Sequence, residues 1–379
     1  MEKNCKSILN KKRINRIVAI NQSSGYLMQD IVTAFAEHYE EVVLLASWPL
    51  NGVKTDRIAA FDRRSSARRL WTWLVATVQI WWKIIWKYRK DKLFIVSNPP
   101  SAPLLPLIVR NCFSLLIFDV YPDVLVNQQK LSKNHFVIRW WQKANQKVYS
   151  KAKHVFTISK GMKDCLCQYV EADKIKVMPL WPNNAQIHKI EKSENPFIKE
   201  HDLEGKFIVL YSGNLGSTHR VEVLIDVAQK VKDTIFLIVG QGAKMELIVE
   251  RIKKEHCENV IQLPRQPMER LSEVLSAADI AVVTLDTSAS QMSVPSKTFN
   301  LMAVGVPLMC IASPESELGR LIRKSEMGRV FLPDDIDGMA SFVNEMKDDC
   351  VLKKRLGQNA LDASKHYTSE NAKILVHNA

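Results

Sequence analysis

FIVLYSGNLG, residues 207–216, indicates the fold of this chain more directly than any other stretch. Its first five residues form an apolar run of the kind that becomes a buried strand, and glycines follow at Gly213 and Gly216. Helical periodicity resumes at residues 221–231. A strand that ends in a glycine-rich turn and leads into a helix is typical of the first βα unit of a Rossmann-like domain.

Strands and helices alternate on both sides of this stretch. Downstream, strands are expected at residues 234–239, 260–263, 280–284 and 307–311, with helices between them. Upstream, strands are expected at residues 16–21, 41–46, 93–97, 115–119 and 154–159, and helices at 26–38 and 66–88. This alternation predicts parallel sheets with right-handed crossovers, and therefore an α/β fold of two Rossmann-like domains facing a cleft.

The length of 379 residues suits two domains. A segment that is rich in proline and charge, and has no periodicity, divides the two runs of strands and helices. We therefore expect an N-terminal domain at 1–182, a linker at 183–206 and a C-terminal domain at 207–360. A C-terminal helix at 361–379 is expected to pack back on the N-terminal domain. Ligands should bind at the carboxyl ends of the strands.

Positive charge is concentrated in the first half of the chain. The whole chain has a formal net charge of +13 and is 46% apolar, which is ordinary for a soluble globular protein. Residues 1–185 hold 29 Lys and Arg against 13 Asp and Glu, whereas residues 186–379 hold 24 against 27. An anionic partner, either nucleic acid or an acidic membrane surface, is therefore expected to meet the first half alone.

The seven cysteines include no C-x-x-C pair, and their number is odd. This pattern argues against a disulfide framework and against a zinc site, and it favours a reducing compartment. The apolar run at residues 17–20 is followed at once by polar residues, so it is too short for a signal peptide. We expect a cytoplasmic protein with no metal site.

SVPSKTFNLMAVGVP, residues 293–307, is the strongest candidate for a binding motif. Pro295 suits the first turn of a helix and Ser296 suits its cap, so a helix is expected to start here. A helix N-terminus offers free N–H groups to a phosphate, and Lys297 adds a full positive charge. The alternative is an ordinary capped helix on the surface, and the motif alone does not separate the two.

Two glycine turns follow other predicted strands. In the first, residues 211–216, the glycines let the backbone approach a ligand, and His219 and Arg220 open the next helix within reach of a diphosphate. The second is VGQG at residues 239–242, where Gly240 follows the strand. Each turn alone is a weak signal, because neither matches the dinucleotide fingerprint and glycine also serves plain turn geometry.

Taken together and in this order, these motifs resemble the retaining GT-B glycosyltransferases of family 4. The resemblance covers residues 207–345 and includes the L-x-R-x-P segment at 263–267 and the AADI stretch at 277–280. The Pro-Ser-Lys run resembles one subgroup of this family. SNPP at 97–100 and DVYPD at 119–123 look like the N-terminal halves of members that build bacterial surface polysaccharides.

The resemblance implies a role for each candidate residue. The C-terminal domain would bind a nucleotide-sugar donor, through residues at these positions: Gly213, Asn214, Gly216, His219, Gly240, Arg265, Ser296, Asn300 and Leu301. Lys297 and Arg220 would neutralise the diphosphate of the donor. Gly240 and Arg265 would lie beside the nucleobase.

The reaction implied by the resemblance is a retaining, metal-independent transfer of a hexose from a nucleotide-sugar, with UDP favoured and no cofactor. The acceptor would be a polyprenyl-diphosphate-linked sugar or a glycan, in capsular, exopolysaccharide or O-antigen synthesis. Two alternatives stay open. A GT-B nucleotide-sugar epimerase needs carboxylates and histidines in the cleft, and the Pro-Ser-Lys pattern fits transferases better. A basic nucleic-acid-binding protein needs aromatic residues interleaved as stacking platforms, whereas the aromatic residues here are grouped with aliphatic ones on a helix, so no nucleic-acid partner is expected.

The sequence departs from the family pattern at four positions. Many members carry glutamates where Met292 and Asn300 stand, and the second glutamate binds ribose hydroxyls. Asn300 still donates and accepts hydrogen bonds, but more weakly than a carboxylate accepts them. Many members also carry Arg and Lys where Asn214 and His219 stand. A protein of low activity is therefore an open alternative.

Asp119 and Asp123 are the candidate catalytic acids of the N-terminal half. They lie at and just after the end of a predicted strand, where one carboxylate would orient or deprotonate an acceptor hydroxyl. The alternative is a turn that the two aspartates cap. Gly25, in the first βα loop, would let that loop close near the transferred sugar, and the alternative is a plain turn glycine.

Tryptophans cluster in the helix expected at residues 66–88. Trp71, Trp81, Trp82 and Trp86 lie in an apolar run between groups of Arg and Lys. Such a helix suits the headgroup region of a membrane, and it is too short and too interrupted to span one. Peripheral contact with the inner face of the cytoplasmic membrane is the favoured interpretation, and a core helix with basic ends is the alternative.

Overall fold

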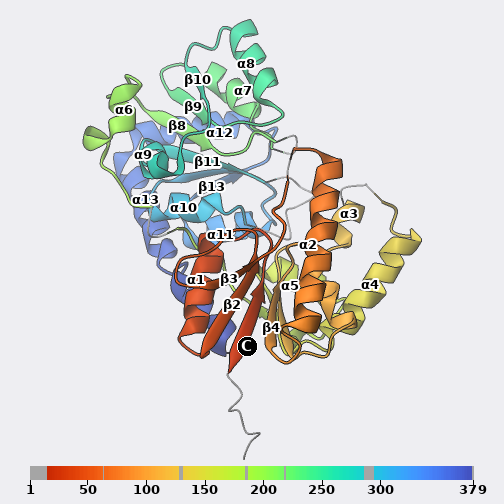
Figure 1. Cartoon of the computed structure of the whole chain (residues 1–379). Coiled ribbons are helices and arrows are strands. Elements are labelled where there is room, and N and C mark those ends of the chain that lie inside the picture. The colour runs from red at the N-terminus through yellow and green to blue at the C-terminus, as the bar shows by residue number, and fades with distance from the viewer. Residues whose placement is uncertain are drawn as a thin grey trace, which may run out of the picture. The chain divides into compact units, whose positions relative to one another are not determined.

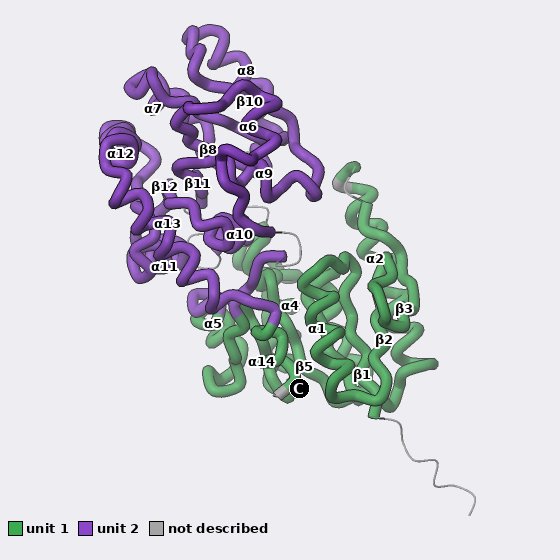
Figure 2. The backbone as a smooth tube through the Cα atoms, turned by 90° about the vertical axis from the view of Figure 1, so that its left-hand side faces the viewer, with its two compact units in different colours: residues 1–158, 163–178, 370–379 green, residues 159–162, 179–369 purple. Residues whose placement is uncertain are grey.

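The structure is a computed structural model that describes residues 15–62, 64–127, 131–183, 187–216, 219–285 and 294–377. The chain divides into two compact units, which Figure 2 shows in different colours. Unit 1 comprises residues 1–158, 163–178 and 370–379. Unit 2 comprises residues 159–162 and 179–369.

A parallel sheet of seven strands forms the centre of unit 1. Its strands are β1 (Arg16–Ile20), β2 (Glu41–Ala46), β3 (Lys54–Arg57), β4 (Lys92–Val96), β5 (Phe113–Ile117), β6 (Val155–Thr157) and β7 (Ile175–Val177). They pair in the order β3-β2-β1-β4-β5-β6-β7. β1, β4 and β5 are buried along almost their whole length, because helices cover both faces of a parallel sheet.

The helices of unit 1 connect these strands. They are α1 (Tyr26–Ala36), α2 (Ser66–Trp86), the 3₁₀ helix η1 (Ala102–Leu107), α3 (Asp123–Asn127), α4 (Phe136–Tyr149) and α14 (Lys373–His377), and α5 (Lys160–Leu166) follows β6. Figure 1 labels β2, β3 and β4 of the sheet together with the helices α1 and α2. α2 begins where the Ser65 hydroxyl accepts a hydrogen bond from the Arg68 N–H, a standard N-cap. α14, near the end of the chain, packs against α1.

Unit 2 contains a parallel sheet of six strands in the order β10-β9-β8-β11-β12-β13. The strands are β8 (Ile208–Ser212), β9 (Ile235–Val239), β10 (Val260–Leu263), β11 (Ile280–Thr284), β12 (Leu308–Ile311) and β13 (Gly328–Phe331). The helices are α7 (Val223–Lys230), α8 (Met245–Lys254), α9 (Leu271–Ser276), α10 (Lys297–Ala303), α11 (Glu317–Ser325), α12 (Ile336–Asp348) and α13 (Cys350–Ser364). This is the strand order of a dinucleotide-binding Rossmann sheet.

The segment expected to be a linker, residues 183–206, differs from that expectation where the structure describes it. It contains α6 (Pro196–Glu200), which packs against α9. The Asn195 side chain accepts a hydrogen bond from the Phe197 N–H and donates one to the Glu273 carbonyl oxygen, and Phe197 is fully buried. Burial of Phe197 removes apolar surface from water, so this part of the segment belongs to unit 2.

Candidate functional site

The strand order of unit 2 reverses between β8 and β11, which are neighbours in the sheet. Connections that leave two such strands run to opposite faces, and sheets of this order bind their ligands at the carboxyl ends of these strands. The turn that starts at Gly213 follows β8. α10, which starts at Lys297, is the first helix after β11 in the described part of the chain. The fold therefore brings two motifs that are far apart in the sequence to one edge of the sheet.

Lys297 occupies an unusual position at this edge. The side chain as a whole is partly exposed, but its ammonium nitrogen is buried and has no hydrogen-bond partner among the described residues. The nitrogen lies 3.9 Å from the centroid of the Tyr211 ring, in a cation–π contact. The Tyr211 hydroxyl donates to the Asn214 carbonyl oxygen at 2.8 Å, which fixes the ring. Burial lowers the pKa of Lys297 to about 7, because the charged form loses hydration without gaining an anion.

The Gly213 turn lies directly against this ammonium group. Gly213 has a φ of +153°, which favours glycine. A Cβ atom at Gly213 would lie 2.5 Å from the Lys297 nitrogen, so a side chain there would collide with the ammonium. The structure thus places backbone of the glycine turn and the buried cation side by side, as the phosphate-binding hypothesis requires.

The two glycine turns are locked to each other. A Cβ atom at Gly240 would lie 1.9 Å from the Gly213 carbonyl oxygen, so glycine is needed there for the close approach. The Leu215 N–H donates to the Gln241 carbonyl oxygen at 2.9 Å, and the Gln262 side chain donates to the Gly240 carbonyl oxygen at 3.3 Å. These contacts give the Gly213 turn a defined position before any ligand binds.

No hydrogen bond or ion pair joins Arg220 or Arg265 to Lys297 among the described residues. Arg220 forms an ion pair with Glu222 at 3.4 Å, and its side chain is 56% exposed. The backbone oxygen of His219 accepts a hydrogen bond from the Lys244 ammonium at 2.8 Å. A Cβ atom at Gly216 would lie 2.9 Å from the imidazole of His219, so glycine gives this ring room. Arg265 lies exposed just beyond β10.

α10 differs from the expected capped helix. Ser296 has helical backbone angles and its side chain makes no cap hydrogen bond, so the prediction that Ser296 caps the helix is wrong. A residue that is already helical cannot turn its hydroxyl back onto the first free N–H groups. Asn300 and Thr298 each have a buried side-chain oxygen without a partner in the described residues, and Leu301 is buried. Met292 lies outside the described residues.

α10 has seven residues, so the case for anion binding rests on the Lys297 side chain rather than on a long helix dipole. Sequence reasoning identified Lys297 and the glycine turns, but it missed Tyr211, Gln262 and Thr298. Tyr211 looks like an ordinary strand residue in the sequence.

A cavity of about 620 Å³ elsewhere in unit 2 lies at the opposite edge of the sheet, beside residues that precede β11 and β12.

The two candidate acids of unit 1 have different surroundings. Asp123 accepts hydrogen bonds from the side chains of Gln142 at 3.0 Å, Gln168 at 3.2 Å and Tyr169 at 2.6 Å. These three donors tie α4 and the end of α5 to the start of α3, which is a structural role. Asp119 follows β5, and no hydrogen bond or ion pair of its carboxylate occurs among the described residues. Desolvation by the surrounding protein raises the pKa of the Asp119 carboxyl.

Gly25 directly precedes α1 and has an extended backbone with φ −142°. A Cβ atom at Gly25 would meet nothing within 4 Å. Turn geometry therefore does not require glycine at this position, and the loop has open space beside it.

The tryptophans of α2 divide into two groups. Trp71, Trp82 and Trp86 are 66%, 63% and 72% exposed. Trp81 is half-buried and its indole nitrogen is buried, so the structure does not place Trp81 on the exposed face.

The described residues include no group of His, Cys, Asp and Glu able to hold a metal, and no helix among them has the length and apolar content to cross a bilayer.

Comparison with known proteins bears on the fold and the activity of the chain. Residues 193–362 match glycosyl transferases group 1. The probable glycosyltransferase WbjE of Pseudomonas aeruginosa is 23% identical over 354 residues, which are 88% of each chain. The chitobiosyldiphosphodolichol beta-mannosyltransferase of Candida albicans is 22% identical over 314 residues, 76% of this chain and 68% of that protein. The crystal structure of Anabaena Alr3699/HepE in complex with UDP has a TM-score of 0.73 and 13% identity, over 96% of this chain and 98% of that one.

Two parallel α/β units and these neighbours define the GT-B class of fold, as the sequence predicted. Within that class the chain is a glycosyltransferase, and residues 193–362 are the part that matches the group 1 glycosyl transferases. The roles of the individual site residues remain predictions.

Proposed function

We propose that the protein transfers a hexose from a nucleotide-sugar to a lipid-linked or glycan acceptor during the synthesis of a bacterial capsular polysaccharide, exopolysaccharide or O-antigen. UDP is the favoured nucleotide, because the structurally similar Alr3699/HepE is seen in complex with UDP. The observation that carries the proposal is the buried ammonium of Lys297, which lies beside the Gly213 turn and has no anionic partner among the described residues.

A buried cation without a partner is costly, and it persists where an anion compensates for it in the working state. A donor diphosphate at the carboxyl ends of β8 and β11 would supply that anion. The Thr298 hydroxyl and the Asn300 Oδ1 atom have no partner among the described residues. The hydroxyl can donate to a phosphate oxygen, and the Oδ1 atom can accept from a sugar hydroxyl of the donor. As the glycosidic bond breaks, negative charge grows on the leaving diphosphate, and a preorganised ammonium stabilises that charge.

The reaction is proposed to be metal-independent, because the Lys297 ammonium and backbone N–H groups can stabilise the negative charge of the leaving group in place of a metal ion. It is proposed to be retaining on the basis of the family resemblance. Excess EDTA should leave the initial rate unchanged, and NMR of the first product formed should show the donor's anomeric configuration. Loss of activity with EDTA, or an inverted anomer, would contradict these two statements separately.

The test of donor binding is the exchange of Lys297 for methionine, which keeps the side-chain length and removes the charge. We expect Lys297→Met to weaken UDP binding at pH 7 by about tenfold or more, the value of one charged hydrogen bond. Isothermal titration measures the affinity. Lys254→Met, at an exposed lysine on α8, is the matched control. Equal affinities in the two variants would remove Lys297 from the donor site.

The acceptor is proposed to be held by unit 1 at a membrane surface. A relative of this chain acts on a diphosphodolichol lipid, as its name states. The exposed apolar side chains of α2 recur every three to four residues along one face of the helix: Leu70, Trp71, Leu74, Val78, Trp82, Ile85 and Trp86. We call this set the α2 stripe. The opposite face, with Ala76, Ile80 and Ile84, is buried against the unit, so the stripe is not the core face.

The charges at both ends of the stripe favour an anionic bilayer as its partner. Arg64 and Arg68 near the start of α2 are 76% and 59% exposed, and Lys87 just after its end is 58% exposed. Aromatic side chains between basic groups suit the interface between lipid headgroups and acyl chains. We therefore propose peripheral attachment to an anionic membrane through the α2 stripe.

A further inference from the structure

A groove of about 450 Å³ lies in unit 1 where β3 meets α2. It is lined by Asp56, Arg57, Val78, Gln79, Trp82, Lys83, Trp86 and Lys87. Three of these residues, Val78, Trp82 and Trp86, also belong to the α2 stripe. The groove therefore opens onto the surface that is proposed to contact the membrane.

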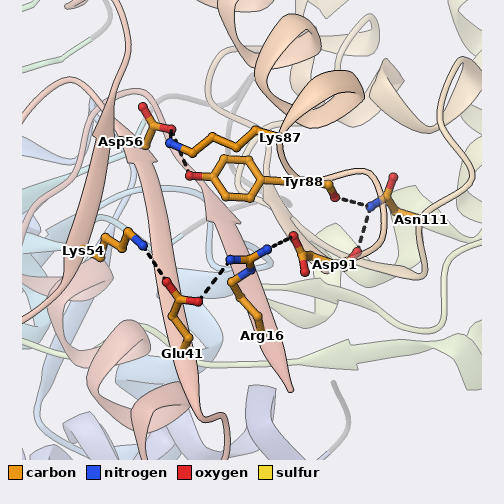
Figure 3. A network of polar contacts seen from close by, with 8 residues as sticks. All are labelled: Arg16, Glu41, Lys54, Asp56, Lys87, Tyr88, Asp91 and Asn111. Carbon is orange, nitrogen blue, oxygen red and sulfur yellow. Dashed lines mark hydrogen bonds and ion pairs between the residues drawn. The ribbon is translucent and has the colours of Figure 1, made fainter. Parts of the chain in front are cut away.

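The basic side chains of the groove are held in place and outnumber its acid. Asp56 accepts hydrogen bonds from the ammonium groups of Lys83 and Lys87 and from the Tyr88 hydroxyl, the last two at 2.8 and 2.9 Å. Figure 3 shows Lys87 and Tyr88 both directed at the Asp56 carboxylate. These donors hold the pKa of Asp56 at about 2, so this carboxylate stays ionised. One carboxylate balances one of its two lysines, and positive charge is left over.

Arg57 adds a further positive charge with no partner of its own. It is exposed at the end of β3, and no hydrogen bond or ion pair of its guanidinium occurs among the described residues. Gln79 accepts a hydrogen bond from the Ala59 N–H at 2.6 Å through its carbonyl oxygen, which leaves its amide N–H groups as donors. A guanidinium, an ammonium and an amide are the donors that a phosphate oxygen accepts from.

The apolar wall of the groove consists of Trp82 and Trp86. Their ring centroids are 5.4 Å apart with a tilt of 36°, and both rings are mostly exposed. The exposure of this much aromatic surface to water is unfavourable. Aromatic surface beside cationic donors matches a molecule with a phosphate at one end and a hydrocarbon chain at the other.

We infer that the groove between β3 and α2 binds the headgroup of an anionic phospholipid, with its phosphate against Arg57, Lys87 and Gln79. The glycerol and the start of the acyl chains lie against Trp82 and Trp86. The inference rests on the proposed membrane contact and makes it more specific. It adds to the general apolar surface of the α2 stripe a defined site for one anionic lipid.

A soluble short-chain lipid tests the groove without a bilayer. Dihexanoyl phosphatidylglycerol, kept below its micelle concentration, should bind the full chain saturably and change its tryptophan fluorescence. Arg57→Gln should weaken that binding about tenfold, as expected for one charge-assisted contact. Arg139→Gln, at an exposed arginine on α4, is the matched control and should bind as the parent does. Equal binding by both variants, or no saturation by the parent, would overturn the inference.

Two further arms separate the possible sources of a bound phosphate. Glycerol 3-phosphate lacks acyl chains and should bind more weakly than the short-chain lipid, and equal binding would assign the groove to a free phosphate ester and overturn the lipid site. Phosphatidylglycerol vesicles test the wider membrane contact. If the parent binds vesicles but not the short-chain lipid, the membrane proposal stands and the groove inference fails. If it binds neither, both fail.

Discussion

Lys297 is the residue whose chemistry depends most on its setting. Its pKa is lowered to about 7, whereas an exposed lysine titrates near 10.5, because its ammonium is buried without an anion. A bound diphosphate favours the charged form and raises that pKa again. UDP binding above pH 7 must therefore be accompanied by proton uptake, and the affinity for UDP should fall as pH rises above about 7.

This proton uptake is measurable. At pH 8 UDP is fully ionised, so titration of UDP into the protein in two buffers of different ionisation enthalpy should report close to one proton taken up per UDP. Lys297→Met should take up fewer. Identical uptake by parent and variant at pH 8 would show that Lys297 does not titrate on binding, and the role of its lowered pKa would be lost.

The two aspartates of unit 1 should respond differently to substitution. Asp119→Asn should lower the turnover number about 10²-fold or more, as for loss of a general base, with UDP affinity and melting temperature unchanged. Asp123→Ala removes the shared acceptor of three hydrogen bonds and should destabilise unit 1 by about 1–3 kcal/mol. Thermal melting and steady-state kinetics on both variants are the measurements. A stable but inactive Asp123→Ala would reverse the assignment.

At the residue scale, the sequence was informative where one residue type has a single physical use. Gly213, Gly240 and Lys297 follow from the need for close backbone approach and positive charge at strand ends. The contact between Tyr211 and Lys297 could not be predicted, because it joins residues that lie 86 positions apart and depends on the strand order. The prediction that Ser296 caps the helix was wrong, because the sequence pattern does not show at which residue the helical backbone angles begin.

α2 shows both the reach and the limit of an element's sequence pattern. Its length was predicted closely, as residues 66–88 against Ser66–Trp86. Both of its faces are apolar, so composition alone could not say which tryptophans are exposed. The structure resolves this, because Ala76, Ile80 and Ile84 face the core and define the opposite side as the α2 stripe. Trp81 lies next to Trp82 in sequence but off that stripe.

The α2 stripe should carry membrane binding. Trp71→Ala combined with Trp82→Ala should weaken binding to vesicles containing phosphatidylglycerol about 10-fold or more, because each exposed tryptophan contributes on the order of 1–2 kcal/mol on insertion. Co-sedimentation with vesicles measures the affinity. Trp48→Ala is the control, because Trp48 is 65% exposed but does not belong to α2. A loss of similar size in the control would exclude a specific role for the stripe.

For the whole molecule, alternation of strands and helices was enough to predict two parallel α/β units. The strand order was not predictable, because it depends on contacts between segments distant in the sequence. β3, β7 and β13 are three to four residues long, and β3 reads KTDR, so neither apolar runs nor alternation marks them. Phe197 likewise gave no local sign that part of the presumed linker packs into unit 2.

The C-terminal segment of the chain, residues 370–379, belongs to unit 1 with the N-terminal residues. Leu375 of α14 is fully buried, and α14 packs against α1 in unit 1, although residues 179–369 before it belong to unit 2. Leu375→Ala should therefore cost unit 1 about 2–5 kcal/mol, the usual range for a buried leucine. Hydrogen exchange should accelerate in α1 while β8 stays protected. Val351→Ala, at an exposed valine of α13, should change neither. Faster exchange in β8 with α1 unchanged would mean that α14 stabilises unit 2 instead.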